Sequence, residues 1–165
     1  MAEGKILVYY GEGKGKSASA LGHAIREAGQ GKNVIIIQFL KEKNEDEISF
    51  IRRLEPEIKF FRFEKSSENY NELSEEEKKE ESINIKNGFS FAKKVLVTKE
   101  CNVLILDEFL GLLDNQVISL EELELLLQAK SEDTEIIFTG RAMQTDMSRS
   151  ADEIYCYCIH GTNEQ

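Results

Sequence analysis

The feature that most constrains the fold is a glycine-rich turn between an apolar run and a helical pattern. Residues 4–17 read GKILVYYGEGKGKS. The apolar run Ile6–Tyr10 predicts a buried strand, and residues 17–28 follow with the spacing of an amphipathic helix. Glycines in such a turn let the backbone curl until several N–H groups point inward at the start of the helix. A strand, a glycine-rich turn, Lys-Ser and a helix together predict a phosphate-binding loop, or P-loop.

This loop supplies the first candidate residues. Lys16 would bring a positive charge to the β- and γ-phosphates of a nucleotide, and the Ser17 hydroxyl would bind Mg²⁺. The general pattern has glycine at the position of Tyr10, so a plain surface turn with solvated lysines is the alternative. The flanking strand and helix favour a nucleotide triphosphate site. Its predicted nucleotide-binding residues are Gly11, Glu12, Gly13, Lys14, Gly15, Lys16, Ser17 and Ala18.

Length and charge limit the classes of protein to which the chain can belong. The 165 residues predict a single domain, 1–165, and 41% hydrophobic residues suffice for a core. A formal net charge of −10 argues against a large surface for nucleic acid or for anionic membranes. No apolar stretch is long enough to span a bilayer, and the first residues lack the features of a signal peptide. We therefore expect a cytoplasmic protein.

The cysteines fit the same expectation. Cys101, Cys156 and Cys158 are an odd number in a chain without a predicted secretory signal, which favours a reducing compartment. Cys156 and Cys158 lie two apart in a predicted strand and so share a face. They could bind a metal, but no CxxC motif or histidine-rich partners accompany them. We predict instead that they are small buried residues.

Apolar runs and helical patterns alternate along the chain. Several runs are almost wholly apolar, which is typical of parallel strands covered on both faces. The order predicts an α/β fold, with a mostly parallel sheet of about six strands and helices on both faces. Strands are predicted at 6–10, 34–39, 58–63, 103–107, 135–139 and 153–158, and helices at 17–28, 46–54, 74–98 and 119–129.

An acidic segment, residues 64–81, interrupts this pattern. It holds eight acidic residues and three lysines, which accounts for about half of the net charge. We interpret 64–74 as a solvated excursion and 75–81 as the solvated start of the long helix. A mobile lid is the alternative.

The second half of the predicted site follows the strand at 103–107. Four apolar residues lead to Asp107 and Glu108, and a buried parallel strand delivers such acids to the sheet edge where ligands bind. Either carboxylate would bind Mg²⁺, directly or through water, so Ser17, Asp107 and Glu108 are the predicted metal ligands. Two acids at the end of a strand are also common without a function.

Two further strands end at the same edge. Arg141 follows the strand at 135–139 and could reach the phosphates or the adenosine, where a guanidinium offsets negative charge. An arginine on the surface after a turn is the alternative. Gln38 and Lys41, at the end of the strand at 34–39, are weaker candidates for nucleotide contacts. Lys16, Glu108 and Arg141 are the predicted catalytic residues.

These motifs resemble a known family. YGEGKGKSASALGHAIREAGQGKNVIIIQFLK is similar to the opening of the ATP:corrinoid adenosyltransferases of the cobalamin pathway, whose G-x-G-K-G-K-[ST] loop likewise lacks the first glycine. The resemblance continues in VLILDE at 103–108, in the helix at 120–127, in IIFTGRA at 136–142 and in SADEIYCY at 150–157. It covers most of the chain, and the motifs are fairly specific when taken together.

The resemblance implies a RecA-like P-loop fold, usually as a homodimer. It implies transfer of the 5′-deoxyadenosyl group of ATP to the reduced cobalt of a corrinoid, with release of triphosphate, and an electron-donating flavoprotein as a partner. Charge would accumulate on the departing triphosphate, where Lys14, Lys16 and Mg²⁺ would stabilise it. The cobalt is the nucleophile, so the protein need not supply a nucleophile or a general base.

The sequence also departs from the family pattern. Ser17 and Ala18 stand where two threonines are common, and the chain begins almost at its first strand, where many members carry an extension that covers the corrinoid. It has no tryptophan, although the family has a tryptophan-containing aromatic segment after the third strand. The ATP half of the site is therefore matched more fully than the corrinoid half. A different P-loop ATPase or kinase, and a non-catalytic nucleotide-binding module, are the alternatives.

Overall fold

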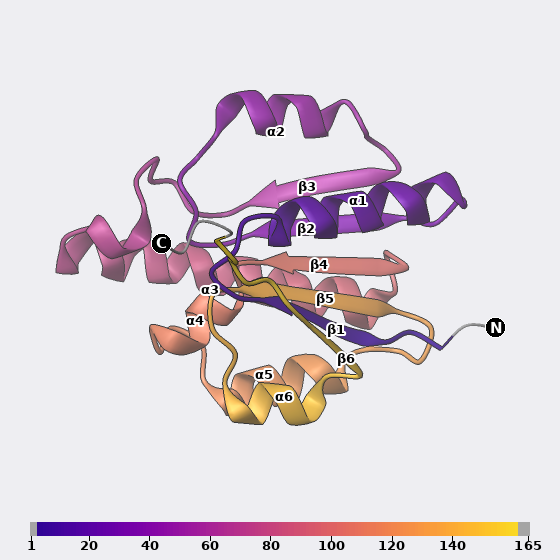
Figure 1. The fold of residues 1–165 in the computed structure, drawn as a ribbon. Helices are drawn as coiled ribbons and strands as arrows, with labels where there is room; N and C mark the ends of the chain where they lie inside the picture. Colours follow the sequence, from indigo (N-terminus) through magenta and orange to yellow (C-terminus); the bar gives the residue numbers. More distant parts are fainter. Residues whose placement is uncertain (1–2, 162–165) are drawn as a thin grey trace.

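A parallel six-stranded sheet organises the computed structural model, which describes residues 3–161 (Figure 1). The strand order is β3-β2-β4-β5-β1-β6, and every neighbouring pair is parallel. All the carboxyl ends therefore meet at one edge of the sheet. The strands are β1 (Ile6–Tyr10), β2 (Val34–Gln38), β3 (Ile58–Arg62), β4 (Val103–Asp107), β5 (Glu135–Gly140) and β6 (Glu153–Cys156).

Helices α2, α3 and α5 begin at residues whose side chains cap free backbone N–H groups. Ser74 and Ser119 each form a capping box with the glutamate three residues later, and the Asn44 side chain accepts from the Glu47 amide. The helices are α1 (Lys16–Gly29), α2 (Glu45–Arg52), the 3₁₀ turn η1 (Tyr70–Glu72), α3 (Glu75–Thr98), α4 (Leu110–Asp114), α5 (Leu120–Gln128) and α6 (Thr145–Ser150).

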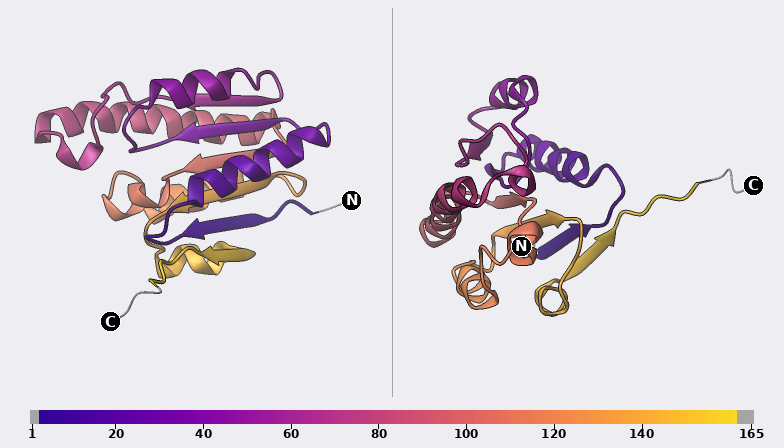
Figure 2. Two further views of the ribbon diagram at one scale, coloured as in Figure 1. Left: turned by 45° about the horizontal axis from the view of Figure 1, so that its top comes forward. Right: turned by 90° about the vertical axis from the view of Figure 1, so that its left-hand side faces the viewer.

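The sheet separates two hydrophobic cores because successive side chains of each strand point to opposite faces. In β2, Val34 and Ile36 pack with α1 and α2, whereas Ile35 and Ile37 pack in the larger core with α3, α4, α5 and α6. The end-on view in Figure 2 shows these two helical layers. Burial on both faces explains why the strands are almost continuously apolar.

The predicted α/β architecture is confirmed, with small differences at the ends of elements. All six strands and four helices predicted from the sequence are present, shifted by at most two residues at either end. Two short helices, α4 and α6, were not predicted. The α4 sequence LGLLD directly prolongs the apolar run of β4, and α6 carries only one buried residue, Met147, so neither has a clear helical period.

Three predictions about burial are wrong. Cys156 and Cys158 are exposed, because β6 is an edge strand that ends at Cys156 and Cys158 lies beyond it. Glu64 and Glu81, predicted to be solvated, are only 7% and 6% exposed. Each carboxylate is buried because it accepts hydrogen bonds from backbone N–H groups: Glu64 from Leu40, and Glu81 from Lys65 and Ser66.

None of the helices in residues 3–161 combines the length and the apolar character required to cross a membrane.

Candidate functional site

The loop between β1 and α1 is held open by contacts of its backbone. Gly11 and Gly15 have positive φ values, 130° and 107°, which only glycine adopts readily. The Gly11 N–H donates to the Gly140 carbonyl at 3.1 Å, and the Gly13 N–H donates to the Tyr157 carbonyl at 2.9 Å. A Cβ at Gly11 would overlap the Tyr157 carbonyl. Position 11 must therefore be glycine for two independent reasons.

Helix α1 presents uncapped N–H groups to this loop. Its N-cap is Gly15, which offers no side chain to accept from the first turn, and that turn contains no acidic residue. The N-terminus of a helix carries partial positive charge, and its free N–H groups favour an anion. Lys16 adds a full charge there, since its Nζ donates to the Gly11 carbonyl at 2.6 Å and the Gly13 carbonyl at 3.3 Å. The loop thus has the polarity of a phosphate site.

A cluster around Asp107 joins the loop to the carboxyl ends of β4 and β5. The Asp107 carboxylate, 5% exposed, accepts from the Ser17 hydroxyl at 2.8 Å and from the Thr139 hydroxyl at 2.7 Å. Its other oxygen lies 2.8 Å from Lys41 Nζ, which also donates to the Ser17 hydroxyl. The structure therefore brings together Ser17 and Asp107, which are 90 positions apart in the sequence.

Glu108 lies beside this cluster on a constrained backbone. Its φ is 58°, and its N–H donates to Thr139 Oγ1 at 2.8 Å. Burial and the neighbouring Asp107 charge raise the pKa of the Glu108 carboxyl, while Lys41, Lys16 and Arg141 oppose that rise. Three cationic side chains thus surround the predicted metal ligand Glu108. Of the two carboxylates, Asp107 is the one that accepts a hydrogen bond from Ser17.

The loop, Lys41, Glu108 and Arg141 enclose one cavity. Its volume is about 570 Å³. Glu12, Gly13, Lys14, Gly15, Lys16, Ser17 and Ala18 line it together with those three residues. Gln38, predicted as a weaker candidate, does not line this cavity: it is buried and accepts from the Arg62 guanidinium at 3.4 Å.

A second hollow of about 380 Å³ continues from the first, because Lys41, Glu108 and Arg141 line both. Its remaining walls come from the chain after β2, from the segment around η1, and from α4 and the residue that follows it. These residues are Leu40, Asn69, Asn71, Gly111, Asp114 and Asn115. The site is therefore an anion-binding loop that opens into a mostly polar hollow at the carboxyl edge of the sheet.

Comparison with known proteins assigns the family. The model of the family ATP:corrinoid adenosyltransferase BtuR/CobO/CobP matches residues 2–157, almost the whole chain. The chain belongs to this family.

Individual relatives of this adenosyltransferase family are distant. Corrinoid adenosyltransferases of Pseudomonas aeruginosa and Escherichia coli are each 27% identical over 92% of this chain, which covers 73% and 74% of their lengths. An uncharacterised protein of Nostoc sp. is 31% identical over 92% of this chain, and the chain spans 43% of the length of that relative.

The fold is also similar to that of a solved protein with low sequence identity. A KaiC-like protein from Pyrococcus horikoshii OT3 superimposes with a TM-score of 0.59 and 16% identity, over 94% of this chain and 73% of the other. The RecA-like class predicted from the sequence is thereby confirmed.

Sequence reasoning missed the residues that hold Lys41 in the candidate site. Arg62 donates to the Lys41 carbonyl at 2.6 Å and to the Ser66 carbonyl at 2.8 Å. Glu64 accepts from the Leu40 amide at 2.7 Å, at a residue whose φ is 61°. These contacts fix the backbone from which the Lys41 side chain reaches Asp107. The only sequence signal was a pair of charged residues, Arg62 and Glu64, in an otherwise aromatic run, FFRFE.

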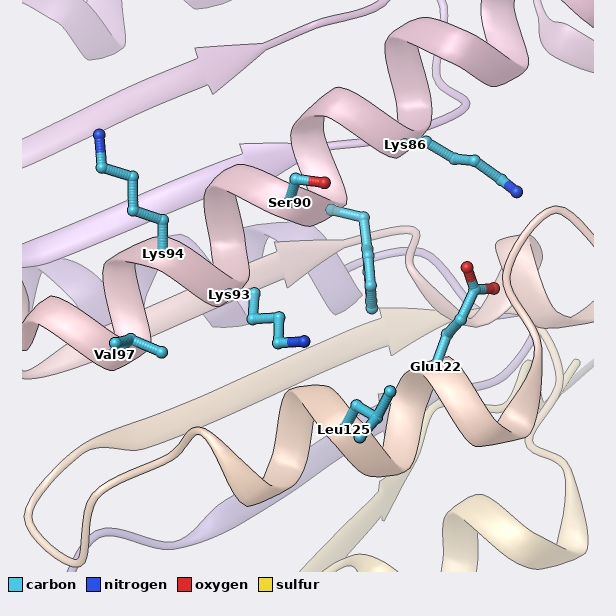
Figure 3. A pocket seen from close by; sticks show the side chains of 8 residues that line it. Lys86, Ser90, Lys93, Lys94, Val97, Glu122 and Leu125 are labelled. Atoms are coloured by element: carbon cyan, nitrogen blue, oxygen red, sulfur yellow. The ribbon is translucent and has the colours of Figure 1, made fainter.

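Another hollow lies apart from these residues, between α3 and α5 (Figure 3). Phe89, Val97 and Leu125 form its apolar part, and Lys86, Lys93 and Glu122 its polar part. None of the predicted site residues lines it.

Proposed function

We propose that this protein transfers the 5′-deoxyadenosyl group of ATP to the reduced cobalt of a corrinoid and releases triphosphate. The observation that carries the proposal is the cluster in which the P-loop residue Ser17 meets Asp107 and Lys41, beneath a cavity lined by Lys14, Lys16 and Arg141. Membership of the adenosyltransferase family supplies the reaction class.

The residues of the cluster suit Mg²⁺. The Ser17 hydroxyl and the Asp107 carboxylate are hard oxygen ligands. The Lys41 ammonium contacts both groups, which indicates that this position accommodates a cation. No three His, Cys, Asp or Glu side chains within residues 3–161 come together as a metal centre. That fits a cation that phosphate oxygens help to hold. Bound there, Mg²⁺ would supply charge stabilisation to the triphosphate.

The reaction places few demands on protein acids and bases. The cobalt contributes an electron pair to the new bond with C5′, and the bond between C5′ and its oxygen breaks with its electrons passing to the triphosphate. Preorganised N–H groups of the loop and the Lys16 ammonium would stabilise that charge, assisted by Lys14 and Arg141 at the cavity wall. Glu108 would face the sugar or a bound water from the junction of the two hollows.

The test is an assay of the purified protein with chemically reduced cobalamin and Mg–ATP. We expect the visible spectrum of the adenosylated corrinoid and one triphosphate per turnover. Lys16→Ala should abolish both signals, whereas Lys79→Ala, a charge deletion on an exposed part of α3, should keep them. Release of ADP and phosphate instead would identify an ATPase. Clear ATP binding without a spectral change would contradict adenosyl transfer.

A homodimer and an electron-donating flavoprotein are part of the same proposal. Both come from the family resemblance and can be tested by sedimentation and by replacing the chemical reductant with a reduced flavoprotein in the assay.

A further inference from the structure

The chain that leaves β6 forms the back wall of the P-loop. The Tyr157 N–H donates to the Tyr10 carbonyl at 2.8 Å, and the Tyr157 carbonyl accepts from Gly13 at 2.9 Å. The same carbonyl occupies the space that a side chain at Gly11 would need. The backbone position of Tyr157 thus determines where two glycines of the loop can lie.

Two exposed thiols flank that residue. Cys156 and Cys158 are both exposed and free, in contrast to the buried Cys101. The rings of Tyr155 and Tyr157 contact Tyr9, at centroid distances of 5.2 and 5.9 Å, on one face of the sheet. Because side chains alternate along an extended chain, Cys156 and Cys158 lie on the opposite face.

The neighbourhood of Tyr10 supports this placement. A hydrogen bond with Cys156 is the main cause that raises the pKa of the Tyr10 hydroxyl, and Cys158 contributes to the same rise. The Sγ atom of Cys158 lies 3.6 Å from Nε2 of His160. The two thiols therefore share a face next to the loop, with an imidazole beside one of them.

A bond between these thiols would move Tyr157. Residues two apart in an extended chain have Cα atoms about 6.6 Å apart, at the upper end of the range that disulfides span. The commonest separation is about 5.5–6 Å, and a disulfide that closes at that separation would shorten the chain at Tyr157. The Tyr157 carbonyl would then turn or shift, and the Gly13 N–H would lose its acceptor.

We infer that Cys156 and Cys158 form a reversible oxidation site that controls the conformation of the P-loop. A peroxide oxidises one thiol to a sulfenic acid and yields one water. The second thiol then attacks that sulfur and releases a second water as the disulfide forms. Two electrons and two thiol protons leave the protein, and the peroxide is reduced to two waters. A dithiol reductant reverses the change.

This inference rests on the proposed function only in taking residues 11–17 as the ATP site. The corrinoid acceptor of the proposed reaction must carry reduced cobalt, so it is available only under reducing conditions. If oxidation lowers the affinity of the site for ATP, the protein would leave ATP unbound when no corrinoid can be adenosylated.

The experiment compares reduced, peroxide-treated and re-reduced full-length protein. Peptide mass spectrometry should find a loss of two hydrogens in the peptide that contains both Cys156 and Cys158. Calorimetry with Mg–ATP should then give an affinity about fivefold weaker or more in the oxidised protein, since loss of one backbone hydrogen bond is worth about that factor. Re-reduction should restore it. Cys156→Ser and Cys158→Ser should each make the affinity insensitive to peroxide.

The possible results separate the two proposals. If the reduced protein binds no ATP, the proposed function fails, and amide hydrogen exchange of residues 11–16 in the oxidised and reduced forms still tests the inference. The inference is overturned if the intrachain disulfide forms and neither ATP affinity nor that exchange changes. It is also overturned if oxidation gives only sulfinic acid or bonds between chains.

Discussion

At the scale of single residues, Asp107 holds most of the site together. Three side chains from separate parts of the chain donate to its carboxylate: Ser17 of α1, Lys41 after β2 and Thr139 of β5. If Mg²⁺ binds beside Ser17, Asp107 is the protein carboxylate best placed to hold it.

We expect Asp107→Asn to weaken Mg²⁺-dependent ATP binding by about tenfold or more, because hydrogen bonds and contacts to a charged group are worth about 1.5–3 kcal/mol. The measurement is the ATP dissociation constant as Mg²⁺ is titrated. Asp133→Asn, on the exposed surface, is the matched control. An unchanged dependence on Mg²⁺ would rule out Asp107 as a metal ligand.

Glu64 predicts a dependence of stability on pH. Burial raises the pKa of Glu64 to about 7 from an ordinary 4.5, so the folded chain binds a proton more tightly than the unfolded chain. The free energy of unfolding should therefore fall as the pH rises from about 4.5 to 7.

Glu64→Gln keeps an acceptor for the Leu40 amide and removes this titration. Urea unfolding at pH 5, 6, 7 and 8 should show the wild type losing up to about 3 kcal/mol relative to this variant. Glu68→Gln, on an exposed residue of the same segment, should follow the wild type. Parallel pH curves for wild type and Glu64→Gln would show that Glu64 keeps its ordinary pKa.

At the scale of elements, a buried glutamate of α3 binds the backbone of the segment before that helix. Glu81 accepts from the amides of Lys65 and Ser66 at 3.1–3.2 Å, from inside the helix. Its removal would leave those amides without a partner and free the segment that carries Asn69 and Asn71 into the second hollow.

Glu81→Ala should speed amide hydrogen exchange across residues 65–72 at least about tenfold and cost about 1–3 kcal/mol of global stability. Glu80→Ala is exposed on the same helix and should change neither. Exchange that stays as slow as in the wild type would mean that other contacts fix the segment.

The same elements show which site residues could be predicted from the sequence and which could not. The P-loop, the acids after β4 and Arg141 were predictable because each follows an apolar strand whose direction sets the edge on which it lies. Glu64 and Glu81 were not, because charge patterning predicts solvent exposure unless the backbone N–H groups that pair with them are known. Those amides come from other parts of the chain.

At the scale of the whole molecule, the sheet separates two cores, and β4 lies at its centre. The order β3-β2-β4-β5-β1-β6 could not be predicted from the sequence, since it depends on which crossovers pass over other strands. Leu106 of β4 is fully buried in the larger core, whereas Leu125 of α5 is 50% exposed.

Leu106→Ala should therefore lower the free energy of unfolding by about 2–5 kcal/mol, through lost contacts and a cavity. Leu125→Ala should change it by less than about 0.5 kcal/mol. Urea unfolding of both variants measures the difference. Equal effects would contradict the burial of β4 between two helical layers.

The common direction of the strands also decides where the molecule can be modified. β1 and β6 are parallel neighbours, so the chain enters β1 at the amino edge and leaves β6 at the edge that carries the P-loop. A fluorescent label or affinity tag joined ahead of β1 is attached a full strand length from the cavity beside the loop. One joined after residue 161 follows the segment that contacts Gly13 and so leaves from the same edge of the sheet as the loop. Immobilisation for binding measurements is therefore best made through the N-terminal side.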